Sequence, residues 1–180
     1  RGKKVLINAG PTHEHLDPVR YLGNNSSGRM GTAIAQAARD AGAEVTLVLG
    51  PTQAQLDLEG LNVIHVVSAK EMLVAMQENF SNAVLTICTA AVSDFTPTSA
   101  AEHKIKKDPN TTEMTITFEK TPDILSHLGS KKSPLQKVVG FALETQDGAA
   151  YAQGKLTSKN ADAIVLNTVG KTGVGFETST

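Results

Sequence analysis

Six short apolar runs constrain the fold of this chain more than any other feature. They are rich in Val and Ile, are mostly bounded by Gly, Pro, Asn or Asp, and cover residues 5–9, 45–49, 63–67, 84–89, 138–142 and 163–166. Runs of this length and composition predict buried strands. Segments with helical spacing lie between several of them, at 28–41, 69–80 and 148–159. Strands that alternate with helices predict an α/β, Rossmann-like fold, in which a mostly parallel sheet carries helices on both faces.

The helical segment at 69–80 has a clear local start signal. Ser68-Ala69-Lys70-Glu71 forms a capping box, in which Ser68 and Glu71 can each satisfy a free N–H of the other. Met72, Met76 and Phe80 follow at helical spacing. We therefore expect this helix to begin directly after Ser68.

One region interrupts the alternation of strands and helices. Residues 95–109, FTPTSAAEHKIKKDP, have little periodic apolar content. Met114, Ile116 and Phe118 then alternate with polar residues, as in a half-exposed strand. We expect a flexible basic loop and a small antiparallel extension from the main sheet.

Length, charge and cysteine content limit the class of protein. The chain has 180 residues with 40% hydrophobic content, which predicts a single domain over 1–180. Its 17 Lys+Arg and 18 Asp+Glu nearly cancel, so no overall field favours nucleic acid or an anionic membrane. Its one cysteine, Cys88, cannot form an internal disulfide, and no signal peptide or membrane-spanning run is evident. We expect a cytoplasmic protein, truncated at the C-terminus, because residues 170–180 have loop composition.

The segment around Ser26, Ser27 and Gly28 is a candidate anion site. These residues follow the first strand and lead into a helix, whose free N–H groups and dipole favour a phosphate; glycine lets the phosphate approach closely. An ordinary N-cap with glycines used for helix packing explains the stretch equally well.

Two familiar nucleotide motifs are excluded by spacing. The glycines at 23, 28 and 31 come too late after the first strand for a dinucleotide fingerprint, and the second strand ends in Leu49-Gly50-Pro51 without an acidic residue. A standard P-loop is excluded because Gly28-Arg29-Met30 replaces its Gly-Lys-Ser/Thr.

Further candidates follow other strands. Small residues at 89–93 let a ligand lie against the backbone, and Asp94 can accept a hydrogen bond or help to hold a cation, although an Asx turn is the commoner role. Lysines 104, 106 and 107 can close over a phosphate or simply form a solvated charge run. Lys155 and Lys159 share one helix face. Both lysine clusters suit a polyphosphate.

The histidines and the cysteine carry weaker signals. His13 and His15 lack an evident third ligand, so we interpret them as surface residues rather than a metal pair. Cys88 lies within an apolar strand and is interpreted as a core residue. The sequence offers no convincing pair of nucleophile and base.

Six blocks in unbroken order resemble one enzyme family: AGPTHEHLDPVRYLGNNSSGRMG, TAAVSDF, EHKIKK, KTPDIL, VGFALET and KLTSKNADAIVLN. The chain resembles the phosphopantothenoylcysteine synthetase (phosphopantothenate-cysteine ligase) family from about Lys4 to Phe176. In many bacteria such a domain is the C-terminal half of a bifunctional coenzyme A biosynthesis protein. The other half, a flavin-dependent decarboxylase, has no counterpart in these 180 residues.

The resemblance implies a ligase that joins 4′-phosphopantothenate to L-cysteine with CTP and Mg²⁺. The carboxylate attacks the α-phosphate to form an acyl-cytidylate and release pyrophosphate, and the cysteine amine then displaces the nucleotide. The resemblance does not identify metal ligands.

The resemblance also assigns site residues. Its nucleotide-binding positions are Gly10, Ser26, Gly28, Gly31, Thr89, Ala90, Asp94, Lys104, Thr121, Pro122, Asp123, Ile124, Phe141, Lys155, Lys159 and Asn167. Its phosphopantothenate-binding positions are Arg20, Asn24, Ala90, Ala91 and Asp94. Residues 121–124 match a segment that reads the base, with Thr121 where many family members carry Asn.

The resemblance further implies a homodimer, because Arg20 matches an arginine that reaches the neighbouring subunit's site. Asn24 and Lys104 are the implied catalytic residues. We hypothesise that Asn24 donates a hydrogen bond to the acyl-cytidylate as cysteine attacks, while Lys104 neutralises charge on the phosphates.

Two other functions remain open from the sequence. Tyr151 and Lys155 have the Tyr-x-x-x-Lys spacing of some NADP-dependent reductases on the same fold, although the dinucleotide fingerprint is missing. The same loops and lysines would also suit a non-enzymatic nucleotide-binding module.

Overall fold

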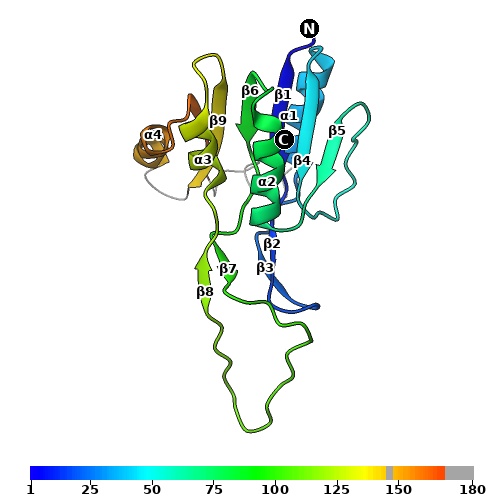
Figure 1. Ribbon diagram of the computed structural model, residues 1–180, viewed down its shortest axis with the longest axis vertical. Coiled ribbons are helices and arrows are strands. Elements are labelled where there is room, and N and C mark those ends of the chain that lie inside the picture. Colours follow the sequence, from blue (N-terminus) through cyan, green and yellow to red (C-terminus); the bar gives the residue numbers. More distant parts are fainter. Residues whose placement is uncertain (145–147, 169–180) are drawn as a thin grey trace.

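A six-stranded parallel sheet forms the centre of the computed structural model, which describes residues 1–144 and 148–168 (Figure 1). Its strands are β1 (Lys4–Ala9), β4 (Glu44–Leu49), β5 (Asn62–His65), β6 (Leu85–Cys88), β9 (Lys137–Glu144) and β10 (Ala163–Thr168). Their order is β10-β9-β6-β1-β4-β5, and every neighbouring pair is parallel. All six predicted strands and the Rossmann-like class are confirmed. The expected C-terminal truncation concerns residues 170–180, which lie outside the described residues.

Helices cover both faces of this sheet. The three predicted helices are present as α1 (Arg29–Asp40), α2 (Ala69–Phe80) and α4 (Gly148–Ser158). Ile7 of β1 packs in one core cluster with Ala35 of α1, whereas its neighbour Leu6 packs in the other with Met72 of α2. Because both faces are buried, the strands read as continuous apolar runs rather than as alternating ones.

The start of α2 confirms half of the predicted capping box. The Ser68 Oγ accepts a hydrogen bond from the Glu71 N–H at 3.2 Å. The Glu71 carboxylate, however, accepts from the Val67 N–H at 2.7 Å rather than from that of Ser68. The reciprocal bond is thus made one residue earlier than predicted.

A fourth helix, α3 (Ile124–Lys131), was not predicted. Asp123 is its N-cap and accepts a hydrogen bond from the Ser126 N–H at 2.8 Å. Its apolar residues Ile124, Leu125 and Leu128 are buried in the same cluster as α2. Only eight residues long, the helix is too short to show a helical period in the sequence.

Two small antiparallel sheets lie beyond the carboxyl ends of the main strands. One pairs β2 (His13–His15) with β3 (Tyr21–Gly23), and the other pairs β7 (Phe95–Pro97) with β8 (Phe118–Lys120). Figure 1 shows both below the main sheet, with the loop 98–117 farthest from it. The β7–β8 pair confirms the small antiparallel extension, whereas β2–β3 was not predicted.

The strand expected at 114–118 is wrong in its bounds. Phe118 lies in β8, but residues 111–117 contain no strand, and Met114 is exposed. Alternating polarity stabilises a strand only where one face is covered, and the side chain of Met114 has no such cover.

None of the helices in the described ranges is long and apolar enough to cross a membrane.

Asp162 joins the end of α3 to the start of β9 and leads to a pH-dependent prediction. Its Oδ2 accepts from Lys132 Nζ at 2.8 Å and from the Val138 N–H at 2.9 Å, and its Oδ1 accepts from Lys137 Nζ at 3.0 Å. Burial raises the pKa of Asp162, but these donors outweigh it and bring the pKa to about 2.

The pKa of Asp162 is below its unfolded value, so its stabilisation is present above about pH 4 and is lost as pH falls through about 2. Asp162→Asn is therefore expected to lower the free energy of unfolding by at most about 1 kcal/mol near neutral pH, because solvent screens the ion pairs of Asp162 with Lys132 and Lys137. The difference in unfolding free energy between wild type and variant should shrink from pH 6 to pH 3. Denaturant titrations at both pH values measure it, and a difference that grows on acidification contradicts the assignment.

Candidate functional site

A cavity of about 930 Å³ lies at the carboxyl edge of the central sheet. It lies where the chain turns to opposite sides of β1, with β4 on one side and β6 on the other. Open α/β sheets bind their ligands at such a switch point. The carboxyl ends of four strands meet there, because residues 10 and 89–94, which follow β1 and β6, line the cavity together with residues 141–142 of β9 and residue 167 of β10.

The N-terminus of α1 forms one wall of the cavity. Gly28 has a φ of +74°, and no side chain caps the helix. A Cβ on Gly28 would lie 3.3 Å from the Gly10 Cα, and a Cβ on Gly31 would lie 2.5 Å from the Ala9 Cβ. The alternative interpretation, an ordinary N-cap with glycines used for helix packing, holds only in part. The glycines are required for close packing, but no side chain caps the helix. The N–H groups of the first turn face a cavity that can receive an anion.

Asn8 organises the loop after β6 and was missed from the sequence. Its buried Oδ1 accepts from the Ala90 N–H at 3.0 Å, and its main-chain oxygen accepts from Thr89 Oγ1 at 2.6 Å. These bonds join the ends of β1 and β6 where both line the cavity. One polar residue inside the apolar run 5–9 was the available signal.

Two threonines hold the other end of this loop. Thr12 Oγ1 accepts from the Ser93 N–H at 3.0 Å, and Thr121 Oγ1 donates to the Ser93 carbonyl at 2.5 Å. The Asp94 carbonyl accepts from the Thr121 N–H at 3.0 Å. Asp94 itself is exposed and lines the cavity. Residues 121–124 are thereby brought beside residues 89–94, and both segments line the cavity.

Asn24 lies beside the cavity rather than among its lining residues. Its Nδ2 donates to the carbonyls of Ala91 at 3.0 Å and Val92 at 3.2 Å, both of which belong to lining residues. Among the described contacts, the Asn24 Oδ1 has no partner. The side chain therefore spans from the loop before α1 to the loop after β6.

Lys155 of α4 and Lys159, which follows the helix, contribute positive charge to the cavity lining. Lys155 Nζ donates to the Phe141 carbonyl at 3.2 Å, and Lys159 Nζ pairs with Asp123 Oδ2 at 2.6 Å. Burial raises the pKa of Asp123, but the Lys159 and Ser126 hydrogen bonds outweigh it, so the net pKa is lowered. The predicted shared face of Lys155 and Lys159 is confirmed, since both line the cavity. The lining also includes residues that the sequence did not single out: Met30, Lys120 and Leu125.

Arg20 and Lys104 do not line the cavity of their own chain. Arg20 pairs with Asp17 at 2.6 Å and donates to the Ile105 carbonyl at 2.9 Å. Lys104 is exposed on the loop 98–117. The structure thus unites the other predicted residues near one cavity and leaves these two cations outside it.

His13 and His15 belong to the β2–β3 hairpin. The His13 ring stacks on Tyr21 with centroids 3.6 Å apart, and burial lowers the pKa of His13, followed by the effect of His15. In the described ranges, no group of three or more His, Cys, Asp or Glu side chains could hold a metal ion.

Cys88, the last residue of β6, lines the cavity and packs against the core cluster that includes Leu6 and Met72. Burial raises the pKa of its thiol to about 12. The thiol is therefore protonated at neutral pH and unsuited to nucleophilic attack. Its assignment to the core is confirmed only in part, because the residue is half-buried and also lines the cavity.

The fold and cavity define a Rossmann-like α/β protein with a cavity at the carboxyl edge of its sheet, beside the N-terminus of α1. The chain belongs to the family of the DNA/pantothenate metabolism flavoprotein C-terminal domain, whose model matches residues 1–180. This confirms the resemblance found in the sequence.

Several curated relatives are similar over nearly the whole chain. A prokaryotic protein named cysteine/cysteine sulfinic acid decarboxylase is 50% identical over 97% of this chain and 48% of its own. The coenzyme A biosynthesis bifunctional proteins CoaBC of Vibrio cholerae and Bacillus subtilis are 46% and 45% identical, over 99% of this chain and 44% and 43% of theirs. The chain thus spans less than half the length of these relatives.

Solved structures agree on the fold. The C-terminal domain of a coenzyme A biosynthesis bifunctional protein CoaBC is 44% identical with a TM-score of 0.80, covering 93% of this chain and 78% of that one. The DNA/pantothenate metabolism flavoprotein of Streptococcus pneumoniae has the same TM-score at 25% identity, covering 93% and 83%.

Proposed function

We propose that this domain is a phosphopantothenate-cysteine ligase of coenzyme A biosynthesis. It joins 4′-phosphopantothenate to L-cysteine and uses CTP as the activating nucleotide. The observation that supports this most is that one cavity is lined both by the uncapped N-terminus of α1 and by Lys155 and Lys159. The names of the CoaBC relatives support the same pathway.

The triphosphate would lie at the N-terminus of α1. The main chain at Gly10, Gly28 and Gly31 permits its close approach, and the first-turn N–H groups would donate to it. Lys155 and Lys159 would face its outer oxygens. The cytosine would contact residues 121–124, with Phe141 and Asn167 completing the nucleotide site.

The acyl end of phosphopantothenate would lie by Asn24, Ala90 and Ala91. Its carboxylate oxygen attacks the α-phosphorus of CTP and pyrophosphate leaves, which gives the acyl-cytidylate. The cysteine amine then attacks the acyl carbon, the amide forms and CMP leaves. A covalent intermediate on the nucleotide divides one difficult step into two, so no protein nucleophile is needed. The protonated state of Cys88 is consistent with this route.

Magnesium would enter with the nucleotide. Mg²⁺ is commonly held by substrate phosphates together with one or two carboxylates, rather than by a complete protein cage. The Asp94 carboxylate is exposed on the cavity wall and suits this role, whereas Asp123 is occupied by Lys159. The donor set therefore fits a metal that the triphosphate carries, which would supply charge neutralisation at the phosphates.

A homodimer and a longer polypeptide are part of the proposal. Arg20 and Lys104 lie outside the cavity of their own chain, and a second copy would bring Arg20 to it. The CoaBC relatives are named bifunctional and exceed this chain in length, which suits fusion to a flavin-dependent decarboxylase in a cytoplasmic enzyme.

One assay distinguishes the proposed ligase from its rivals. Pyrophosphate release with CTP and 4′-phosphopantothenate, followed by amide formation with L-cysteine, is the expected result. NADPH oxidation without pyrophosphate release would instead identify a reductase. Binding of CTP without turnover in the full-length protein would identify a nucleotide-binding module, and either result contradicts the proposal.

Lys104→Gln is expected to lower ligase turnover about 10- to 100-fold, the range of one charged hydrogen bond. Lys104 is exposed, so the variant should keep its melting temperature and circular dichroism spectrum. Lys70→Gln, an exposed lysine at the start of α2, is the matched control and should retain wild-type turnover. Wild-type turnover in Lys104→Gln would remove this lysine from the mechanism.

A further inference from the structure

Asp17 is a buried carboxylate outside the cavity. It lies in the turn between β2 and β3, with 1% of its surface exposed. Its Oδ1 accepts from the N–H groups of Val19 and Arg20, both at 2.8 Å. These are bonds that an aspartate before proline typically makes to stabilise its own turn.

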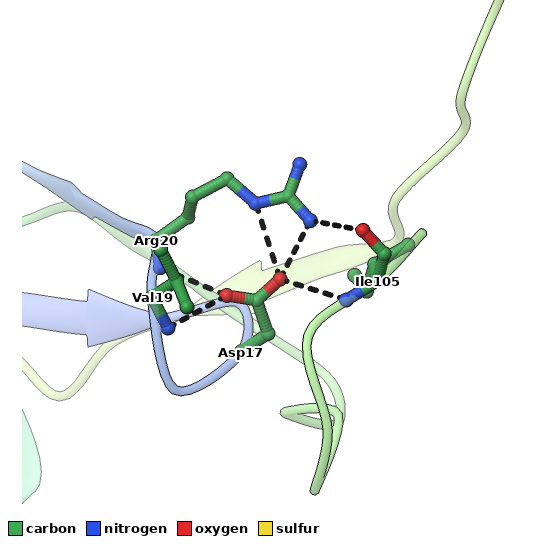
Figure 2. Close-up of polar contacts among 4 residues, drawn as sticks. All are labelled: Asp17, Val19, Arg20 and Ile105. Atoms are coloured by element: carbon green, nitrogen blue, oxygen red, sulfur yellow. Dashed lines mark hydrogen bonds and ion pairs between the residues drawn. The ribbon is translucent and has the colours of Figure 1, made fainter. Parts of the chain in front are cut away.

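The second oxygen of Asp17 makes contacts of a different kind (Figure 2). Oδ2 accepts from Arg20 Nη2 at 2.6 Å and Nε at 3.1 Å, and from the Ile105 N–H at 3.1 Å. Arg20 Nη2 in turn donates to the Ile105 carbonyl at 2.9 Å. Both main-chain groups of Ile105 are therefore held, 88 residues beyond Asp17 in the sequence.

This arrangement anchors the basic loop 98–117 to the β2–β3 hairpin. A second bond, from the Ala101 N–H to the Leu16 carbonyl at 2.9 Å, fixes the same segment. Lys104 and Lys106, which flank the held residue, remain exposed. The Arg20 side chain is 41% exposed, and its Nη1 has no partner among the described residues. Arg20 hydrogen bonding lowers the pKa of Asp17, with burial opposing it, so the carboxylate stays ionised at neutral pH.

We infer that Asp17 is a positioning residue that joins Arg20 and the Lys104 loop into one unit, so that both cations reach the anionic substrates together. The part of the inference that concerns the substrates rests on the proposed function, because that function places Arg20 at phosphopantothenate and Lys104 at the nucleotide. The part that joins Arg20 to the loop rests only on the contacts of Asp17 and Ile105.

Asp17→Asn separates the two roles of the carboxylate. The amide oxygen can replace Oδ1 and keep the turn, but the amide nitrogen would replace Oδ2 and present donors to three other donors. Asp162→Asn is the matched control, since Asp162 also accepts several hydrogen bonds but lies far along the chain, before β10.

The first measurement is limited trypsin digestion of the full-length protein, with cleavage sites identified by mass spectrometry. We expect faster cleavage after Lys104, Lys106 and Lys107 in Asp17→Asn and no change at these sites in Asp162→Asn. Ile105→Pro removes the N–H donor without altering the hairpin, and its cleavage after Lys106 and Lys107 should rise in the same way. Unchanged cleavage in both Asp17→Asn and Ile105→Pro overturns the inference.

The second measurement is steady-state kinetics of pyrophosphate release. Misplacement of both cations should raise the KM for 4′-phosphopantothenate and for CTP, with kcat/KM falling up to about 100-fold. A merely structural role would reduce the active fraction, and hence kcat, with both KM values unchanged; that result also overturns the inference. If the wild-type protein releases no pyrophosphate, the proposed function fails, while the cleavage pattern still decides whether Asp17 holds the loop.

Discussion

Asn24→Asp is expected to slow amide formation about 100-fold, equivalent to about 3 kcal/mol of lost transition-state stabilisation, while the pyrophosphate-releasing step is much less affected. The Asn24 Nδ2 donates to the carbonyls of Ala91 and Val92 beside the cavity. As cysteine attacks, Nδ2 would give up its hydrogen bond to one of these two carbonyls and donate to the acyl-cytidylate instead. A carboxylate has no donor to offer and would repel the two carbonyls.

Separate assays of the two half-reactions test this prediction. Pyrophosphate release from CTP and 4′-phosphopantothenate reports the first step, and consumption of the trapped intermediate by L-cysteine reports the second. Asn25→Asp introduces the same charge at the next, exposed residue and should leave both steps near wild type. Equal losses in both steps for Asn24→Asp would contradict a specific role in cysteine attack.

Gly31→Ala should remove nucleotide binding and destabilise the fold by about 1–3 kcal/mol, the usual cost of overpacking. The new Cβ would meet Thr89 Oγ1 and would lie 2.5 Å from the Ala9 Cβ. The first turn of α1 must then move away from β1, which displaces the N–H groups proposed to bind the triphosphate. The clash opposes the intrinsic preference of helices for alanine, worth about 1 kcal/mol.

Gly154→Ala is the matched control, because it makes the same substitution within α4, where no atom of another described segment lies within 4 Å of the new Cβ. It should be neutral or slightly stabilising, since only helix propensity changes. Denaturant titration gives the free energies of unfolding, and calorimetry gives the affinity for CTP. Unchanged CTP affinity in Gly31→Ala would show that close packing at Gly31 does not shape the phosphate site.

Local signals in the sequence were sufficient for the main architecture. The six apolar runs gave the strands of the parallel sheet because strands buried on both faces must be apolar along their length. The start of α2 was predictable from Ser68 and from the helical spacing after it, because a helix cap and an apolar period both depend on residues within one or two turns. Short elements were missed: α3 spans two turns, and the strands of the β2–β3 hairpin have three residues each, with β3 fully exposed, so they carry no apolar pattern.

The candidate site divides in the same way. Gly28, Gly31, Lys155 and Lys159 were identifiable because each belongs to a local pattern at a strand or helix end. Asn8 was not, because its partner Ala90 is 82 residues away in sequence and becomes a neighbour only when β1 pairs with β6.

By itself, the sequence determined the α/β class, the six strands of the main sheet, three of the helices and the glycine-rich start of α1, since these depend on residues within a few positions of one another. Only the tertiary structure decided which loops share the cavity, that Lys159 pairs with Asp123, and that Asp17 holds Arg20 and Ile105 together. Those contacts depend on strand order and on main-chain groups, and neither carries a signature in the amino-acid sequence.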